Sequence, residues 1–321
     1  MRLASAAIVV ASMFSPASAA VAQSYQTKPI RLVVPFAPGG GGDAVAWPLI
    51  QKLSELIGQQ VAIDNRGGAN GNIGADHVAK SAPDGYTLLF ANSSLPISVT
   101  LYKQLPFDVI TDFTPVSLVS VSPSVLVVHP SLPATTVQDL VALAKAQPGK
   151  LNYASGGTGT TMHLAAELFS TLAGIKIVHV PYKGAGPAIT DFLGGHVKVM
   201  FINIPPVFGQ IQSGKARPLA VTTKKRATVL PDVPTMIESG LPEYESTTWY
   251  GILGPAGLPP DIVTRLSKAV AAAVALPEVR GRLIAVGSEP ETNTPTQFAA
   301  FLRQDIDRWA KVVKASGATA D

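Results

Sequence analysis

The sequence of 321 residues contains no cysteine, and this absence excludes several kinds of site. Without thiols the chain forms no disulfide, no thiolate metal centre and no cysteine nucleophile. A chain without thiols also suits an oxidising compartment, where a stray thiol is a liability. Because no cysteine follows the apolar run near the N-terminus, the sequence offers no residue to carry a lipoprotein's lipid.

Signatures of catalysis and of nucleotide binding are missing as well. The sequence has no Gly-x-Ser-x-Gly nucleophile motif, and neither a P-loop nor a Gly-x-Gly-x-x-Gly fingerprint. The five histidines, at positions 77, 129, 163, 179 and 196, do not have the spacing of metal ligands. The sequence therefore predicts a protein that is not an enzyme and that uses no metal and no cofactor.

The charge pattern gives little sign of a macromolecular partner. The formal net charge of +4 would fall to +3 if Arg2 were removed with a signal peptide. Apart from Lys224-Lys225-Arg226, the basic residues are scattered, and we interpret that triplet as a solvated helix end or loop. We therefore expect no nucleic-acid partner, although a weak positive balance would help to attract anions.

The N-terminal segment has the pattern of a secretory signal peptide. A basic start at Arg2 precedes the apolar run Leu3–Phe14, which is too short to span a bilayer comfortably. Ala20-Val21-Ala22 then fits the small-x-small rule for cleavage. The pattern predicts a signal peptide over residues 1–22, a mature start at Gln23 and a periplasmic protein; an uncleaved membrane anchor is the alternative.

Strands and helices alternate along the rest of the chain, which is typical of an α/β protein with largely parallel sheets. Its length of roughly 300 residues favours two domains. The expected strands are 30–35, 61–64, 86–91, 124–129, 151–155, 175–180, 197–202 and 217–222. Two C-terminal helices, 259–275 and 296–315, are expected to pack on an existing domain. If they return to the first domain, the chain crosses between domains near 116–127 and 243–254.

Two segments have the order strand, glycine-rich loop, helix: residues 33–43 and residues 153–161. Glycine lets the backbone approach a ligand closely, and the following helix offers unpaired N–H groups and a partial positive charge. Each segment is therefore a candidate anion site that needs no arginine. One such loop alone is more often a tight turn. Two of them, one in each half, would suit a dicarboxylate or a carboxylic acid with a second polar end.

With these loops in view, the sequence resembles the substrate receptors of tripartite tricarboxylate transporters, often called Bug receptors. The matching segments cover essentially the whole mature chain in order. They are Pro35–Asp43, Asn65–Leu89, Leu101–Asp108, Asn152–Phe169, Val180–Val197, Pro231–Glu245 and Trp249–Pro259. Gly67 stands where a proline is common in the family, and Asn92-Ser93-Ser94 occupies a variable stretch that faces the pocket.

The resemblance implies a periplasmic-binding-protein type II fold, in which two α/β lobes around a cleft are joined by crossing strands. It implies a lobe formed by residues 23–122 plus 252–321 and a second lobe formed by residues 123–251. It also implies a monomer that captures a small carboxylate for the membrane permease subunits of the transporter. In the family, carboxylates are held by backbone N–H groups, hydroxyls and ordered water, which fall here on 36–41 and 155–160.

The candidate ligand-binding residues lie in the two loops and at the ends of expected strands, where α/β folds bind their ligands. For His163 a hydrogen bond at the helix start is an equal alternative, and for Asp191 a solvated or capping role. Asp43 is expected to be a helix N-cap, and Trp249 and Tyr250 to brace a crossing strand. The candidates are Phe36, Pro38, Gly39, Gly40, Gly41, Asn92, Ser93, Ser155, Gly157, Thr158, Gly159, Thr160, His163, Asp191 and Asn203.

Two alternative functions remain open on the sequence. A periplasmic sensor that presents its ligand-bound form to a signalling receptor would need the same closing fold. A hydrolase for anionic substrates would use the same glycine loops, but the missing nucleophile and cofactor motifs count against it.

Overall fold

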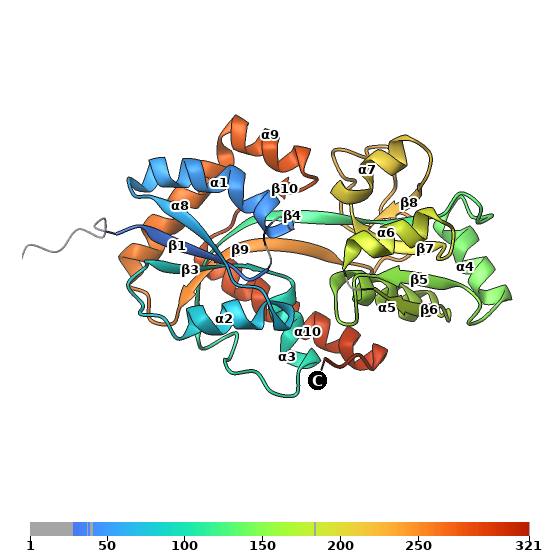
Figure 1. The fold of residues 1–321 in the computed structure, drawn as a ribbon, viewed down its shortest axis with the longest axis horizontal. Helices are drawn as coiled ribbons and strands as arrows, with labels where there is room; N and C mark the ends of the chain where they lie inside the picture. Colours follow the sequence, from blue (N-terminus) through green and yellow to red (C-terminus); the bar gives the residue numbers. More distant parts are fainter. Residues whose placement is uncertain (1–27, 37, 39–40, 183, 321) are drawn as a thin grey trace, which may run out of the picture.

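The computed structural model describes residues 28–36, 38, 41–182 and 184–320. Two α/β lobes lie side by side along the long axis of the molecule, and two long strands run between them (Figure 1). The predicted signal peptide, residues 1–22, and the predicted mature start at Gln23 lie outside the described residues. Over the described part of the chain, no helix combines the length and the apolar character needed to cross a membrane.

The secondary structure follows the alternating order expected from the sequence. The strands are β1 (Ile30–Val34), β2 (Val61–Asn65), β3 (Thr87–Asn92), β4 (Phe113–Val128), β5 (Asn152–Ser155), β6 (Val178–Pro181), β7 (Val199–Asn203), β8 (Arg217–Val221), β9 (Thr247–Pro255) and β10 (Glu289–Pro290). The helices are α1 (Gly41–Ile57), α2 (Asn72–Ala79), α3 (Ser94–Leu101), α4 (Val137–Ala146), α5 (Thr161–Ala173), α6 (Ala185–Leu193), α7 (Pro205–Gln212), α8 (Pro260–Ala275), α9 (Pro277–Ala285) and α10 (Pro295–Ser316), with a 3₁₀ helix at Ala69–Gly71.

The strands form a sheet with the order β2-β1-β3-β9-β4-β7-β5-β6, and both β8 and β10 also pair with β4. Strands β1, β2 and β3 are parallel to one another, as are β5, β6 and β7. Strands β4 and β9 are antiparallel to all of their neighbours. The α/β expectation is confirmed, whereas the expectation of largely parallel sheets needs correction. Among the strands named above, parallel pairs come from the βαβ units, because the crossing strands enter each lobe from the other one and run against the strands they join.

Strand β4 belongs to both lobes. Its residues Phe113–Pro123 pair with β9 and its residues Ser124–Val128 pair with β7, while Val125–Val128 also pair with β8. Strand β9 in turn pairs with β3 of the first lobe. These two strands correspond to the crossings expected near 116–127 and 243–254.

The first lobe buries apolar side chains on both faces of its sheet. Ile30, Leu32 and Val34 face a core beneath α1 and α8, whereas Val33 faces a core beneath α2 and α10. This period of two is the strand pattern of alternating faces. Two further cores lie in the second lobe between residues 125 and 244.

The C-terminal helix α10 touches both lobes. Its first half packs into the core of the first lobe through Phe298 and Leu302. Its second half forms an apolar cluster in which Trp309 packs with Leu101 of α3 and Leu164 of α5. Since α5 follows the second glycine-rich loop, this cluster joins the C-terminal helix to the element that carries that loop (Figure 1).

We predict that Phe298→Ala destabilises the protein by about 3–5 kcal/mol, because it leaves a cavity in the core of the first lobe. The Phe298 side chain is 0% exposed, and its ring packs edge-on against Trp249 with 5.5 Å between centroids. Equilibrium unfolding in urea measures the change. Val99→Ala, at a side chain that is 38% exposed, is the control, with an expected change within about 0.5 kcal/mol. Equal losses in both variants would contradict the assignment of α10 to this core.

Candidate functional site

The first glycine-rich loop is tied to the neighbouring strand by one amide. The Asn65 side-chain Nδ2 at the end of β2 donates to the Phe36 carbonyl oxygen at 3.2 Å and to Asp43 Oδ1 at 2.9 Å. The expectation that Asp43 is the N-cap is wrong, because α1 already begins at Gly41 and Asp43 lies in its first turn. The Asp43 carboxylate is 5% exposed and anchors the loop through Asn65. Gly39 and Gly40 lie outside the described residues.

A small cavity, lined by both apolar and amide side chains, lies behind this loop in the first lobe. Phe36, Asn92 and the start of α2 line it, and its volume of about 10 Å³ leaves room for a single water molecule. The side-chain atoms Asn70 Nδ2 and Asn72 Oδ1 are buried at this cavity without a hydrogen-bond partner among the described residues. Asn72 is 6% exposed. A buried amide without a partner is costly, so this pair is suited to receive a polar group.

Asn70 and Asn72 were missed by the sequence reasoning, which treated them as part of a polar loop. The backbone there is unusual, because Ala69 and Asn70 both have positive φ angles, 47° and 56°. Such strained conformations cluster at functional sites. The available signal was Asn70-Gly71-Asn72 at the start of a helix, since Asn and Gly are the residues that adopt positive φ most readily.

Two further candidates at strand ends lie against the crossing strands. The Ser93 hydroxyl is 0% exposed; it donates to the Thr247 carbonyl oxygen and accepts the Trp249 N–H, both at 3.0 Å. Asn203 Oδ1 accepts the Ser124 hydroxyl at 2.8 Å. The structure thus places Ser93 inside the junction of β3 with β9 rather than on an open surface, which corrects the expectation of ligand contact. Asn203 lies beside the point where β4 passes into the second lobe.

The aromatic pair on β9 has the bracing role expected of it. The Trp249 indole N–H donates to Asp305 Oδ2 on α10 at 2.8 Å, and the Tyr250 ring stacks on Phe90 with 5.7 Å between centroids. The Tyr250 hydroxyl lies 2.7 Å from the position that a Cβ on Gly41 would occupy. Glycine at the start of α1 therefore makes room for this hydroxyl.

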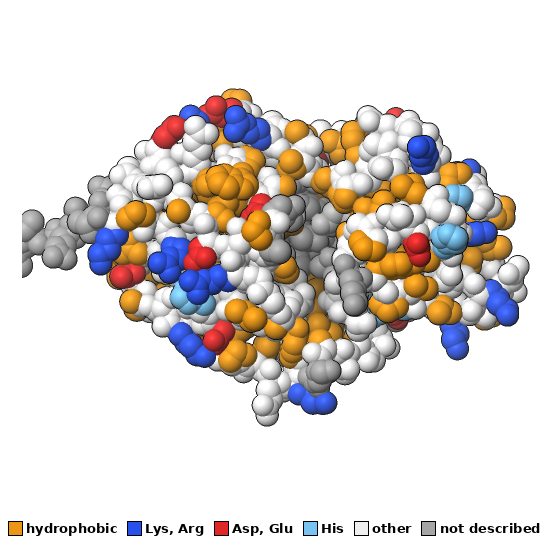
Figure 2. Space-filling model, in the orientation of Figure 1, with side chains coloured by type: hydrophobic (Ala, Val, Ile, Leu, Met, Phe, Trp, Pro, Cys, Tyr) orange, Lys and Arg blue, Asp and Glu red, His pale blue; other side chains and the backbone are white. Residues whose placement is uncertain are grey.

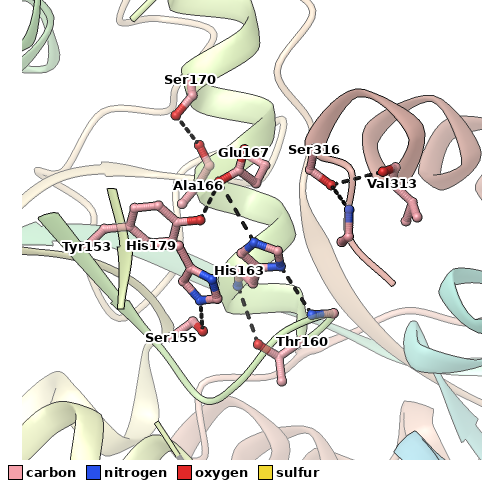
Figure 3. Close-up of polar contacts among 12 residues, drawn as sticks. Tyr153, Ser155, Thr160, His163, Ala166, Glu167, Ser170, His179, Val313 and Ser316 are labelled. Carbon is pink, nitrogen blue, oxygen red and sulfur yellow. Dashed lines mark hydrogen bonds and ion pairs between the residues drawn. The ribbon is translucent and has the colours of Figure 1, made fainter. Parts of the chain in front are cut away.

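The second glycine-rich loop is held by its own hydroxyls. Ser155 Oγ accepts the Gly157 N–H at 3.0 Å and lies 2.6 Å from His179 Nε2. Thr160 Oγ1 donates to the Gly157 carbonyl oxygen at 2.7 Å, and it accepts the His163 N–H as the N-cap of α5. Thr158, between these bonds, is exposed. The Ser155 and Thr160 hydroxyls therefore tie the loop to its own backbone and to His179 and His163 (Figure 3).

Behind this loop lies a group of three rings, of which Tyr153 and His163 are buried and His179 is half-buried. His163 stacks on His179 with 3.9 Å between ring centroids, and Tyr153 stacks on His179 at 5.1 Å. The Tyr153 hydroxyl donates to Glu167 Oε1 at 2.5 Å (Figure 3). Burial, with a smaller contribution from His179, lowers the pKa of His163 to about 4. Burial also lowers the pKa of His179.

Asp191 lies on α6 with its carboxylate already engaged. The Tyr182 hydroxyl, just after β6, donates to Asp191 Oδ2 at 2.6 Å. Burial, and then the Asp191 carboxylate, raise the pKa of Tyr182 to about 12. Asp191 therefore links α6 to the segment that follows β6.

Two α/β lobes joined by crossing strands, with a glycine-rich loop before a helix in each lobe, define a solute-binding fold of type II. On the face shown in Figure 2, the surface has a hollow between the two lobes. The model of the family "Tripartite tricarboxylate transporter family receptor" matches residues 45–318. The chain belongs to this family of receptors. Membership in a receptor family agrees with the prediction that the protein is not an enzyme and removes the support for the hydrolase alternative.

Named relatives resemble the chain over almost its whole length. BugT of Bordetella pertussis (strain Tohama I) is 41% identical over 97% of this chain and 95% of its own length. A structure from R. palustris solved with adipate is 39% identical, with a TM-score of 0.81, over 91% of this chain and 98% of that one. MatC from Rhodopseudomonas palustris with bound malate is 31% identical, with a TM-score of 0.77, over 89% of this chain and 99% of that one.

We predict that the folded protein loses stability as the pH falls from 6.5, the ordinary pKa of histidine, to about 4. Over this range the unfolded chain binds a proton that buried His163 does not, so the free energy of unfolding decreases as the pH falls. The contribution is complete above 6.5 and levels off below about 4. Urea unfolding at several pH values measures the slope.

The His163→Asn variant should have a smaller slope than the wild type, and the remainder comes in part from His179, whose pKa is also lowered. His196→Asn, at an exposed position, is the control and should keep the wild-type slope. An unchanged slope in His163→Asn would show that this ring is not the group that titrates.

Proposed function

We propose that the protein is a periplasmic solute-binding receptor that captures a small organic acid for a tripartite tricarboxylate-type transporter. The main observation behind the proposal is a pair of strand–glycine loop–helix units. One unit ends in helix α1 of the first lobe, and the other ends in helix α5 of the second lobe. Helix N-termini attract anions without a fixed salt bridge. The relatives solved with adipate and malate support a carboxylate ligand, because both of those acids carry a carboxylate at each end.

The proposed ligand contacts come from both lobes. In the first lobe they are Phe36, Pro38, Gly39, Gly40, Gly41 and Asn92, to which the unpartnered amides of Asn70 and Asn72 are added. In the second lobe they are the loop Ser155–Thr160, with the exposed Thr158 at its tip. Amide and hydroxyl groups can bind a carboxylate directly or through ordered water. Asp191 and Asn203 would act at the edge of the site.

The wider arrangement is part of the same proposal. We take residues 23–122 plus 252–321 as the first lobe and residues 123–251 as the second. Closure of the lobes over the acid would give the membrane permease subunits a form to recognise. The receptor would act as a monomer after cleavage of its signal peptide. A sensor role differs from transport only in the partner protein. Binding of the ligand-loaded form to a signalling receptor, and not to a permease, would favour the sensor role.

A thermal-shift screen tests the proposal with the mature protein from Gln23 onward. Dicarboxylates of increasing length, including malate and adipate, are compared with tricarboxylates, acidic amino acids and aromatic acids. A ligand that binds only the folded state raises the melting temperature by mass action. We expect at least one dicarboxylate to do so, with isothermal titration calorimetry as the second measurement. Absence of binding by every acid, together with turnover of an ester or phosphate, would refute the receptor function.

We predict that Gly159→Val abolishes binding of the acid found in the screen while the protein stays folded. Gly159 has a φ angle of +78°, and a Cβ there would lie 2.4 Å from Leu101 Cδ2 of α3. The substitution would therefore both strain the loop and push the lobes apart.

Gly209→Val is the matched control, since a Cβ at this exposed glycine of α7 meets nothing within 4 Å. It should bind the acid as the wild type does. Circular dichroism melting checks the fold of both variants. Unfolding of Gly159→Val, with normal Gly209→Val, would instead assign the loop a purely structural role as a tight turn.

A further inference from the structure

His163 is the side chain that holds the second glycine-rich loop from behind. Its ring Nδ1 accepts the Gly159 N–H at 3.1 Å, and its own backbone N–H donates to Thr160 Oγ1 at 3.4 Å. The residue is 5% exposed. One residue in the first turn of α5 therefore bonds to two consecutive residues of the loop (Figure 3).

The bond to Gly159 requires a particular form of the ring. Nδ1 can accept an N–H only when it carries no proton, so the ring must be neutral with its proton on Nε2. Nε2 is turned toward Glu167 Oε1, 3.8 Å away. The environment keeps the neutral form, because burial lowers the pKa of His163 to about 4.

The groups around the ring come from several elements. Tyr153 and Ser155 lie on β5, His179 on β6 and Glu167 on α5 itself, and α3 and α10 contribute the apolar cluster that includes Leu101. The Glu167 carboxylate is the charged group that faces the ring, 3.8 Å from Nε2. The neutral ring is held by stacking on His179 and by the hydrogen bond from Gly159.

Two loop N–H groups are turned away from any ligand by these contacts. The Gly157 N–H goes to Ser155 Oγ at 3.0 Å, and the Gly159 N–H goes to His163 Nδ1. Both glycines have positive φ angles, 129° and 78°. Thr158 lies between them and is exposed. The conformation that presents Thr158 therefore depends on both inward bonds.

We propose that His163 is a positioning residue, which orients the ligand-binding loop by accepting the Gly159 N–H through a neutral ring and does not touch the ligand itself. The inference rests on the proposed function, in which this loop binds the carboxylate. The alternative hypothesis is that His163 contacts the acid directly. The geometry opposes it, since Nδ1 is occupied, Nε2 faces Glu167 and the side chain is 6% exposed.

Three variants separate these roles by the atom that each preserves. In His163→Asn the amide oxygen occupies about the position of Nδ1, so the acceptor for Gly159 is kept. In His163→Gln a polar group lies near the position of Nε2 instead, and His163→Leu keeps neither. Affinity for adipate is measured by isothermal titration calorimetry, with His196→Asn as the surface control. We expect His163→Asn to bind within about threefold of the wild type and the other two to bind about tenfold or more weakly, as for an unmade buried hydrogen bond.

A second readout needs no ligand. Hydrogen exchange of the Gly159 amide should be slow in the wild type and in His163→Asn and fast in His163→Gln and His163→Leu. Nitrogen NMR of the wild-type ring should show an unprotonated Nδ1 that accepts a hydrogen bond. Slow Gly159 exchange in all variants would overturn the inference whatever the protein binds.

The remaining outcomes keep this inference apart from the proposed function. Fast exchange in His163→Leu with unchanged adipate affinity would also overturn the inference, because the loop would then bind without its anchor. Retained binding in His163→Gln with loss in His163→Asn would assign a direct contact through Nε2. If the wild type binds no acid in the screen, the proposed function fails, and a positioning role toward a carboxylate fails with it even where exchange shows the predicted Gly159 bond.

Discussion

The pairing of β4 with β9 is the constraint on which the relation between the lobes depends. These two antiparallel strands carry the chain out of the first lobe and back again, and their register shifts twice, after Pro115 and after Leu118. The serines of β4 allow a buried crossing that is not purely apolar: the Ser288 hydroxyl bonds to both Ser120 and Ser122 at 2.8 Å. Buried hydroxyls that are all satisfied cost little and fix the register of the crossing. Both loops take their positions from this frame.

The backbones of the two glycine-rich loops are held in place in different ways. The first is anchored from outside by the Asn65 amide, which links its backbone to Asp43 on α1. The second is anchored from inside, by Ser155, Thr160 and His163. In both cases donors and acceptors that could have faced a ligand are used to hold the backbone. Such preorganisation lowers the entropic cost of binding. This favours an acid that is held by the few donors and acceptors left free in the loops.

The sequence predicted the parts of this architecture that depend on local patterns. Strand alternation, both glycine loops and both crossings follow from periodicity and turn residues, and the type II fold follows from the resemblance. The antiparallel pairing of β4 and β9 could not be predicted, because the direction of a crossing strand depends on which lobe the chain comes from. The roles of Ser93 and Asn203 were also out of reach. Strand ends point toward the cleft and the crossing strands alike, and only tertiary contacts distinguish the two. Asn70 and Asn72 were missed because only the folded chain shows that their side-chain amides are buried at one cavity without a partner among the described residues.

The second half of α10 joins the two lobes through contacts that need no ligand. Trp309, Val312 and Val313 pack with Leu101 of one lobe and Leu164 of the other, and Arg308 Nη1 lies 3.4 Å from Glu245 Oε1, just before β9. If only the closed arrangement binds, apparent affinity grows with the fraction of molecules already closed. In a receptor that closes, contacts that favour closure of the empty form would also make that form more similar to the loaded one. A partner that recognises closure would then bind some receptors without ligand, so the apolar contacts of this helix would affect both the affinity for the ligand and the selectivity of the partner for the loaded form.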